Sequence, residues 1–155
     1  MEFSIEVTGL TETEKLAKSL TKYIKEGTVI LLSGDLGAGK TTFTQFVGMY
    51  LGVKRRMSSP TFNIIKSYQG KLTVHHMDCY RLEGSDEDMG FDEYFNGEDV
   101  AIIEWPEFIQ DFLPPEYLDI NIEYVSEDDR RYHFKACGEH YIKLLEDLED
   151  DYAND

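Results

Sequence analysis

The chain has 155 residues, 41% of them hydrophobic, which is enough to build the core of one compact domain. Its 31 acidic residues outnumber its 15 basic ones, and the formal charge of −16 at pH 7 opposes tight binding of a nucleic-acid backbone by this chain alone. Its only cysteines, Cys79 and Cys137, exclude a disulfide scaffold, and the lack of an apolar leader or membrane-length segment favours a cytoplasmic protein without membrane contact.

Two predicted elements open the chain. Thr11 and Glu14 form a capping-box pattern, and the apolar residues after them recur at helical spacing until Gly27, so we expect an amphipathic helix there. Residues 28–33 then form a short, continuous apolar run. Such a run is typical of a strand with both faces buried, and it predicts a central parallel strand.

A glycine-rich motif connects this strand to a second amphipathic helix, whose apolar residues recur between positions 43 and 51. Residues 34–41 read Gly-Asp-Leu-Gly-Ala-Gly-Lys-Thr and match the phosphate-binding pattern G-x-x-x-x-G-K-[ST]. In such a loop, glycines let backbone N–H groups turn inward around phosphates, and the following helix adds its positive N-terminal end. The sequence therefore predicts a nucleotide-binding P-loop and an ATPase.

Each residue of this loop has an expected contact. Lys40 should reach the β- and γ-phosphates, the Thr41 hydroxyl should bind the magnesium ion that bridges them, and Thr42 should meet the α-phosphate. The residues expected to bind ATP are Asp35, Gly37, Ala38, Gly39, Lys40, Thr41 and Thr42.

The elements expected after this helix are mostly strands. Alternating or continuous apolar residues predict the strands, and turn-forming residues separate them. In chain order we expect a hairpin of strands at 61–68 and 71–77, a short helix at 85–94, a buried strand at 100–103, a helix from Pro106, strands at 117–125 and 130–137, and a helix at 141–148.

These elements predict one domain. Strands interspersed with helices indicate an α/β fold, and the loop between a buried strand and a helix indicates the P-loop NTPase type. We expect a three-layer sandwich, with a mostly parallel central sheet and antiparallel additions, built by residues 1–148. Residues 149–155 are mostly acidic and lack an apolar face, so we expect a disordered tail there.

Two carboxylates are candidates for the acidic residue that a P-loop protein needs near its magnesium ion. Asp78 and Glu104 each follow a predicted strand, so either can emerge at the carboxyl edge of the sheet, where ligands collect. Spacing alone does not rank them. Thr61 stands where GTPase-like proteins keep a switch threonine that senses the γ-phosphate, although an ordinary loop fits the same spacing.

Three further residues have roles that the sequence leaves open. His75 and His76 are adjacent, so in a strand they point to opposite faces and cannot simply share one metal ion. Trp105 suits either packing or stacking on a base or substrate. The chain has no Asn-Lys-x-Asp segment that would read guanine, and ATP is therefore the expected nucleotide.

Four segments in a fixed order resemble a known family. They are the P-loop at 34–42, Ser-Pro-Thr-Phe at 59–62, His-x-Asp-x-Tyr-Arg at 76–81 and Ile-Glu-Trp-Pro-Glu at 103–107. On these residues the chain resembles the TsaE family of bacterial ATPases, which are required for forming threonylcarbamoyladenosine in transfer RNA. The likeness covers most of the chain, from the region of Thr11 to that of Arg130.

This resemblance implies roles for the site residues. Thr41 and Glu104 would bind magnesium, while Asp78 would support the metal and the attacking water. Thr61 would belong to a switch-like loop, and Lys40 with the loop amides would hold phosphate.

The resemblance also implies an adenine site and protein partners. The start of the first helix and a late strand would lie near the adenine, in the neighbourhoods of Thr11 and Arg130. ATP hydrolysis would sustain a larger enzyme containing TsaB and TsaD, and transfer RNA would be reached only through that complex. The net charge of the chain agrees with such an accessory role.

A small-molecule kinase that uses the same loop is the alternative function. Such a kinase would need an acceptor pocket and a cationic lid over the phosphates, and the sequence contains no arginine-rich insertion that would provide the lid. A nucleotide-dependent scaffold without meaningful turnover is a third reading.

Overall fold

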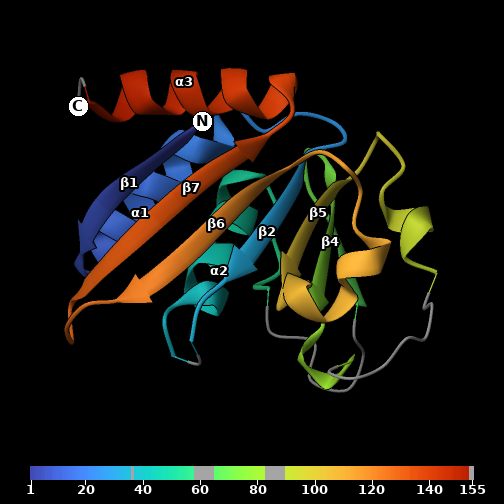
Figure 1. Ribbon diagram of the computed structural model, residues 1–155, viewed down its shortest axis with the longest axis horizontal. Helices are drawn as coiled ribbons and strands as arrows, with labels where there is room; N and C mark the ends of the chain where they lie inside the picture. Colours follow the sequence, from blue (N-terminus) through green and yellow to red (C-terminus); the bar gives the residue numbers. More distant parts are fainter. Residues whose placement is uncertain (36, 58–64, 83–89, 154–155) are drawn as a thin grey trace.

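The strands in the part of the chain that the structure describes pair into one seven-stranded sheet (Figure 1). The computed structural model describes residues 1–35, 37–57, 65–82 and 90–153. In chain order the strands are β1 (Glu2–Thr8), β2 (Val29–Ser33), β3 (Ile65–Gln69), β4 (Thr73–Asp78), β5 (Val100–Glu104), β6 (Tyr117–Tyr124) and β7 (Asp129–Cys137). The α-helices are α1 (Gly9–Thr21), α2 (Lys40–Tyr50) and α3 (Glu139–Ala153), and the 3-10 helices are η1 (Tyr80–Leu82), η2 (Phe91–Tyr94) and η3 (Pro106–Phe112).

The strand order is β1-β7-β6-β2-β5-β4-β3. Strands β6, β2, β5 and β4 run parallel to one another, whereas β1–β7, β7–β6 and β4–β3 are antiparallel pairs. The predicted α/β fold is therefore confirmed, but a mostly parallel sheet describes only its centre. The short turns that join β3 to β4 and β6 to β7 impose antiparallel pairing, because parallel neighbours need a longer crossover.

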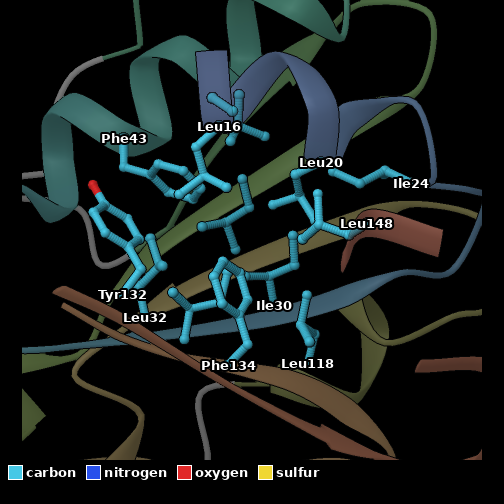
Figure 2. Packing of buried hydrophobic residues seen from close by; sticks show 14 of the residues in the cluster. Leu16, Leu20, Ile24, Ile30, Leu32, Phe43, Leu118, Tyr132, Phe134 and Leu148 are labelled. Atoms are coloured by element: carbon cyan, nitrogen blue, oxygen red, sulfur yellow. The ribbon is translucent and has the colours of Figure 1, made fainter. Parts of the chain in front are cut away.

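Both faces of the central strands are buried, as the continuous apolar run of β2 predicts. Ile30 and Leu32 point into the larger core beneath α1, α2 and α3, and Figure 2 shows them facing Leu16 and Phe43 of the helices. Val29 and Leu31 point into a smaller core on the opposite face. The predicted three layers are present, although segments that contain 3-10 helices, rather than α-helices, cover the second face.

The N-terminal strand β1 is absent from the sequence-based prediction. Its residues alternate between the core and solvent, with Ile5 and Val7 buried and Glu2 and Glu6 exposed, which is the pattern of a half-buried strand. It pairs with β7, more than a hundred residues away along the chain, so local sequence gives little sign of its partner.

Helix α1 begins two residues before the predicted cap. Thr8 occupies the N-cap position, and its backbone N–H donates to Glu12 Oε1 at 3.0 Å, so Thr8 and Glu12 take the places expected for Thr11 and Glu14. The helices expected at 85–94 and from Pro106 are also different. In the helix expected at 85–94, residues 85–89 lie outside the described residues and Phe91–Tyr94 form a 3-10 helix. The helix expected from Pro106 is a kinked 3-10 helix.

Helix α3 extends through Ala153, so the structure differs from the disordered tail expected at 149–155. Tyr152 is partly buried and packs against the larger core, and Lys15 Nζ lies 5.4 Å from the centre of its ring. Lys22 Nζ also donates to Asp151 Oδ2 at 3.1 Å. The apolar ring at position 152 extends the buried face of the helix past the acidic residues. No helix among the described residues is long and apolar enough to cross a membrane.

Candidate active site

The loop between β2 and α2 is shaped by glycines that no other residue can replace without strain. Gly34 has φ 141°, and a Cβ atom there would lie 2.5 Å from the carbonyl oxygen of Ile122. Gly39 forms the N-cap of α2 in a left-handed conformation. The first turn of α2 carries no acidic side chain, so its positive end stays available for an anion. This geometry is that of a phosphate-binding loop.

The side chain of Lys40 lies over this loop and is 6% exposed. Its Nζ donates to the carbonyl oxygens of Gly34 at 2.5 Å and Asp35 at 3.1 Å, and it lies 4.4 Å from the centre of the Trp105 ring. Burial lowers the pKa of Lys40, an effect that the nearby carboxylates of Glu104 and Asp78 oppose. The ammonium group is therefore held between backbone carbonyls, an aromatic face and two acids.

The two carboxylates that spacing alone does not rank lie side by side. Asp78 ends β4 and Glu104 ends β5, and the parallel register places them directly opposite each other. Both face a cleft of about 290 Å³ beside the P-loop, which we call the carboxylate cleft. It is lined by Gly37, Gly39, Lys40, Thr41, Thr42, Asp78, Glu104 and Trp105.

One hydrogen bond joins the ends of these two strands, and a second one fixes the side chain of Asp78 locally. The N–H of Cys79 donates to the carbonyl oxygen of Glu104 at 3.0 Å, and the N–H of Tyr80 donates to Asp78 Oδ1 at 3.1 Å. Cys79 is fully buried, and burial raises the pKa of its thiol to about 12, so this side chain is an uncharged packing residue.

Glu104 is 3% exposed and has a buried partner that the sequence does not reveal. Its Oε2 atom lies 2.5 Å from Nε2 of His76, which is fully buried. The sequence places His76 and His75 on opposite faces, and the structure agrees: His75 instead contacts Ser67 Oγ at 2.7 Å and Asp99 Oδ2 at 2.8 Å. His76 opens the His-x-Asp-x-Tyr-Arg segment at 76–81, but its contact with Glu104 becomes visible only in the structure.

Trp105 follows Glu104 with φ 57°, which makes it the sole non-glycine residue with positive φ in the described part of the chain. Its ring stacks on Phe108 at 5.9 Å and meets Tyr80 edge-on at 5.0 Å. Trp105 therefore packs, which was one of the two readings, and it also lines the carboxylate cleft beside Lys40.

A second pocket, of about 210 Å³, adjoins the other side of the P-loop, and we call it the loop pocket. It shares Gly37, Gly39 and Thr42 with the carboxylate cleft. Its remaining lining residues are Gly9, Leu10, Thr13, Ala38, Glu127, Asp128, Arg130 and Tyr132. Gly9, Leu10 and Thr13 bring the start of α1, the neighbourhood of Thr11, to this pocket, whereas Thr11 itself is exposed and is not among the lining residues.

Arg130 binds the P-loop directly. Its Nε donates to the carbonyl oxygen of Ala38 at 2.9 Å, and one terminal nitrogen donates to the carbonyl oxygen of Ser126 at 2.6 Å. Its guanidinium also stacks over Tyr124, 4.4 Å from the ring centre. Thus Arg130 fixes the position of the loop as well as lining the pocket.

The remaining predicted site residues divide into two groups. Asp35 is exposed at the outer side of the loop, where its carbonyl oxygen accepts from the N–H of Ala38 at 3.0 Å. Thr61 and the Ser-Pro-Thr-Phe segment lie outside the described residues. The switch role of Thr61 therefore stays a prediction.

The donor set of the carboxylate cleft suits magnesium. Thr41, Asp78 and Glu104 provide the hydroxyl and carboxylate oxygens that Mg²⁺ prefers, and Mg²⁺ usually keeps waters and substrate phosphates as its other ligands. Among the described residues there is no cluster of three or more His, Cys, Asp or Glu side chains that could hold a metal without such ligands.

Comparisons with known proteins identify the family of the chain. Residues 7–132 match the family model described as threonylcarbamoyl adenosine biosynthesis protein TsaE. The chain is 47% identical over 138 residues to a Bacillus subtilis protein named tRNA threonylcarbamoyladenosine biosynthesis protein TsaE, covering 88% of this chain and 87% of that protein. A Rickettsia felis protein of the same name is 40% identical over 123 residues, covering 77% and 71%. The crystal structure of Bacillus subtilis YdiB superposes with a TM-score of 0.84 at 38% identity, covering 97% of this chain and 96% of that one. The chain belongs to the TsaE family, whose members act in the biosynthesis of threonylcarbamoyladenosine in transfer RNA.

Proposed function

We propose that this protein is a magnesium-dependent ATP hydrolase that supports the threonylcarbamoyladenosine modification of transfer RNA. One observation carries the proposal: a P-loop, a buried lysine and two strand-end carboxylates meet in a single cleft. Phosphoryl transfer depends mainly on positioning and on neutralising charge, and these groups provide both.

Each residue would make a different contribution to hydrolysis. The amides of Gly37 and Gly39, with Lys40, would hold the phosphates at the N-terminus of α2, whose first turn carries no acidic side chain. The Ala38 amide, which donates to the Asp35 carbonyl oxygen, would have to exchange that bond for a phosphate. Thr41 and Glu104 would hold Mg²⁺, which when bound neutralises charge on the phosphoryl oxygens. Asp78 would orient the attacking water and accept its proton.

The triphosphate and the adenosine of ATP would lie on opposite sides of the loop. The phosphates belong in the carboxylate cleft, where Lys40 supplies positive charge. The adenosine belongs in the loop pocket, where Leu10, Thr13 and Tyr132 supply a mixed apolar and polar lining.

Hydrolysis by the isolated chain is expected to be slow. Among the described residues that line either pocket, Arg130 is the one arginine. Its Nε and one terminal nitrogen donate to backbone carbonyls, and it does not line the carboxylate cleft. Arginine fingers accelerate such reactions by about 10³ to 10⁵. We propose that TsaB and TsaD complete the active site in the cytoplasm, and that transfer RNA binds through that complex.

Calorimetry and phosphate release test this proposal. ATP with Mg²⁺ should bind the purified chain, phosphate should be released slowly, and release should rise when TsaB and TsaD are added. Absence of binding by well-folded protein would overturn the assignment. Transfer of the γ-phosphoryl group to a metabolite, rather than to water, would instead establish the small-molecule kinase.

A further inference from the structure

His76 and Glu104 form a buried pair behind the carboxylate cleft. The His76 side chain is 1% exposed and the Glu104 side chain 4%, and Nε2 of the histidine lies 2.5 Å from Oε2 of the glutamate. A carboxylate buried to this extent needs a hydrogen-bond donor, and His76 provides one.

The sheet register explains how the pair forms. Asp78 lies opposite Glu104, and His76 is two residues before Asp78 on β4, so His76 and Asp78 point to the same face. The Glu104 carboxylate therefore has Asp78 and the cleft on one side and His76 towards the sheet interior on the other. Both residues project from rigid central strands, whose neighbours Val74 and Ile102 are buried in the larger core.

The hydrogen bond constrains the rotation of the glutamate. Glu104 can only accept hydrogen bonds when ionised, so Nε2 of His76 must carry the proton that they share. Nδ1 of His76 has no hydrogen-bond partner among the described residues, so the contact with Glu104 is what orients the ring there. With Oε2 held from behind, the orientation of the carboxylate in the cleft is fixed.

We infer that His76 is a positioning residue that aims Glu104 at the magnesium ion of the nucleotide complex. This inference rests on the proposed function and extends it to a residue that would not touch metal, nucleotide or water. Partners that orient a metal ligand from behind usually change metal affinity by about 10- to 100-fold when removed. The role predicts a defect in the use of Mg²⁺ rather than in the binding of nucleotide itself.

Substitutions at position 76 separate positioning from packing. His76→Leu fills the buried space without a donor, whereas His76→Gln keeps an N–H near the position of Nε2. His75→Leu is the matched control, because its neighbour Ser67 and its partner Asp99 lie away from the cleft. Calorimetry with a non-hydrolysable ATP analogue, with and without Mg²⁺, measures nucleotide and metal binding without requiring turnover.

The expected results are specific. His76→Leu should leave the affinity for the nucleotide without Mg²⁺ within about twofold of wild type. It should reduce the gain in nucleotide affinity that Mg²⁺ provides, the Mg²⁺ enhancement, by about tenfold or more. His76→Gln should restore most of this gain. His75→Leu should behave as wild type. In a Glu104→Gln background, His76→Leu should cause no further loss, because its effect passes through the glutamate.

Three outcomes would overturn the inference. Equal Mg²⁺ enhancement in wild type and His76→Leu would show that the pair is only structural, as would an additive loss in the Glu104→Gln background. If His76→Leu does not fold, His76→Asn takes its place, since its amide is too short to reach Glu104, and unchanged enhancement in that variant would be equally decisive. A wild-type chain that binds nucleotide without any Mg²⁺ enhancement would refute the proposed metal site itself.

Discussion

The two sides of the P-loop differ in where their charges are directed. In the carboxylate cleft, Lys40, Asp78 and Glu104 face a common space. In the loop pocket, the guanidinium of Arg130 instead donates to the backbone carbonyls of Ala38 and Ser126. Both cations therefore contact carbonyl oxygens of the loop, since Lys40 Nζ donates to Gly34 and Asp35. The carboxylate cleft differs in that the strand-end carboxylates of Asp78 and Glu104 lie beside its cation. Under the proposed function, the chemistry would take place in the carboxylate cleft and the adenosine would be recognised in the loop pocket.

The largest effect should follow the loss of Lys40. In Lys40→Ala, we expect turnover to fall by about 100-fold or more, because a preorganised donor to the phosphoryl group is removed from a site with little water. Stability should change little, since burial lowers the pKa of Lys40 and so disfavours its charged form in the fold. Phosphate release and thermal unfolding measure the two quantities, and undiminished turnover would place the chemistry elsewhere.

Substitutions of the two cleft carboxylates, Glu104 and Asp78, should cause different defects. Glu104→Gln should weaken the Mg²⁺ dependence of nucleotide binding, while its amide oxygen still accepts from His76. Asp78→Asn should leave that dependence nearly intact and lower the rate of bound ATP hydrolysis by about 10²- to 10⁴-fold, the usual range for a lost general base. Calorimetry and single-turnover kinetics distinguish them. The reverse pattern would exchange the roles of the two residues.

Arg130 should affect stability and binding more than the rate of the chemical step. Arg130→Leu removes a charged hydrogen bond to Ala38, worth about 1.5–3 kcal/mol, and loosens the loop. Arg131→Leu is the matched control, because its ion pairs with Glu6 and Glu123 are largely exposed and such pairs contribute about 0–1 kcal/mol. Denaturant unfolding compares the two variants. Equal destabilisation would argue against a structural role specific to Arg130.

The smallest effect should come from Asp129, which is not among the lining residues of the loop pocket but stands between two of them, Asp128 and Arg130. Hydrogen bonds from the hydroxyls of Thr8 and Ser126 lower the pKa of Asp129 below its ordinary 3.8. A lowered pKa adds stability above pH 3.8 that disappears as the pH falls through the folded-state value. Asp129→Asn should therefore lower Tm slightly at pH 7, with the difference shrinking below pH 4 and turnover unchanged. A difference that grows in acid would contradict this assignment.

Local patterns predicted the parts of the site that are contiguous in sequence. The P-loop, its flanking strand and helix, and the two strand-end acids follow from spacing and apolar runs alone. That Asp78 and Glu104 share one cleft depends on β4 and β5 being neighbours, which no local pattern encodes. The role of His76, which opens the segment at 76–81, stayed open for the same reason, since its partner Glu104 is 28 residues away. Thr13, rather than Thr11, lines the loop pocket, and α1 begins at Gly9, directly after β1, whose alternating residues were not recognised as a strand.

The left-handed backbone of Trp105 has a cost for the fold. A residue with a Cβ atom in this conformation loses about 1–2 kcal/mol relative to a right-handed one, and glycine would not. The protein thus tolerates an unfavourable turn directly after Glu104 in order to lay an indole ring beside the ammonium of Lys40. A glycine at this position would remove the backbone strain and favour folding. It would also remove the indole ring that lines the carboxylate cleft.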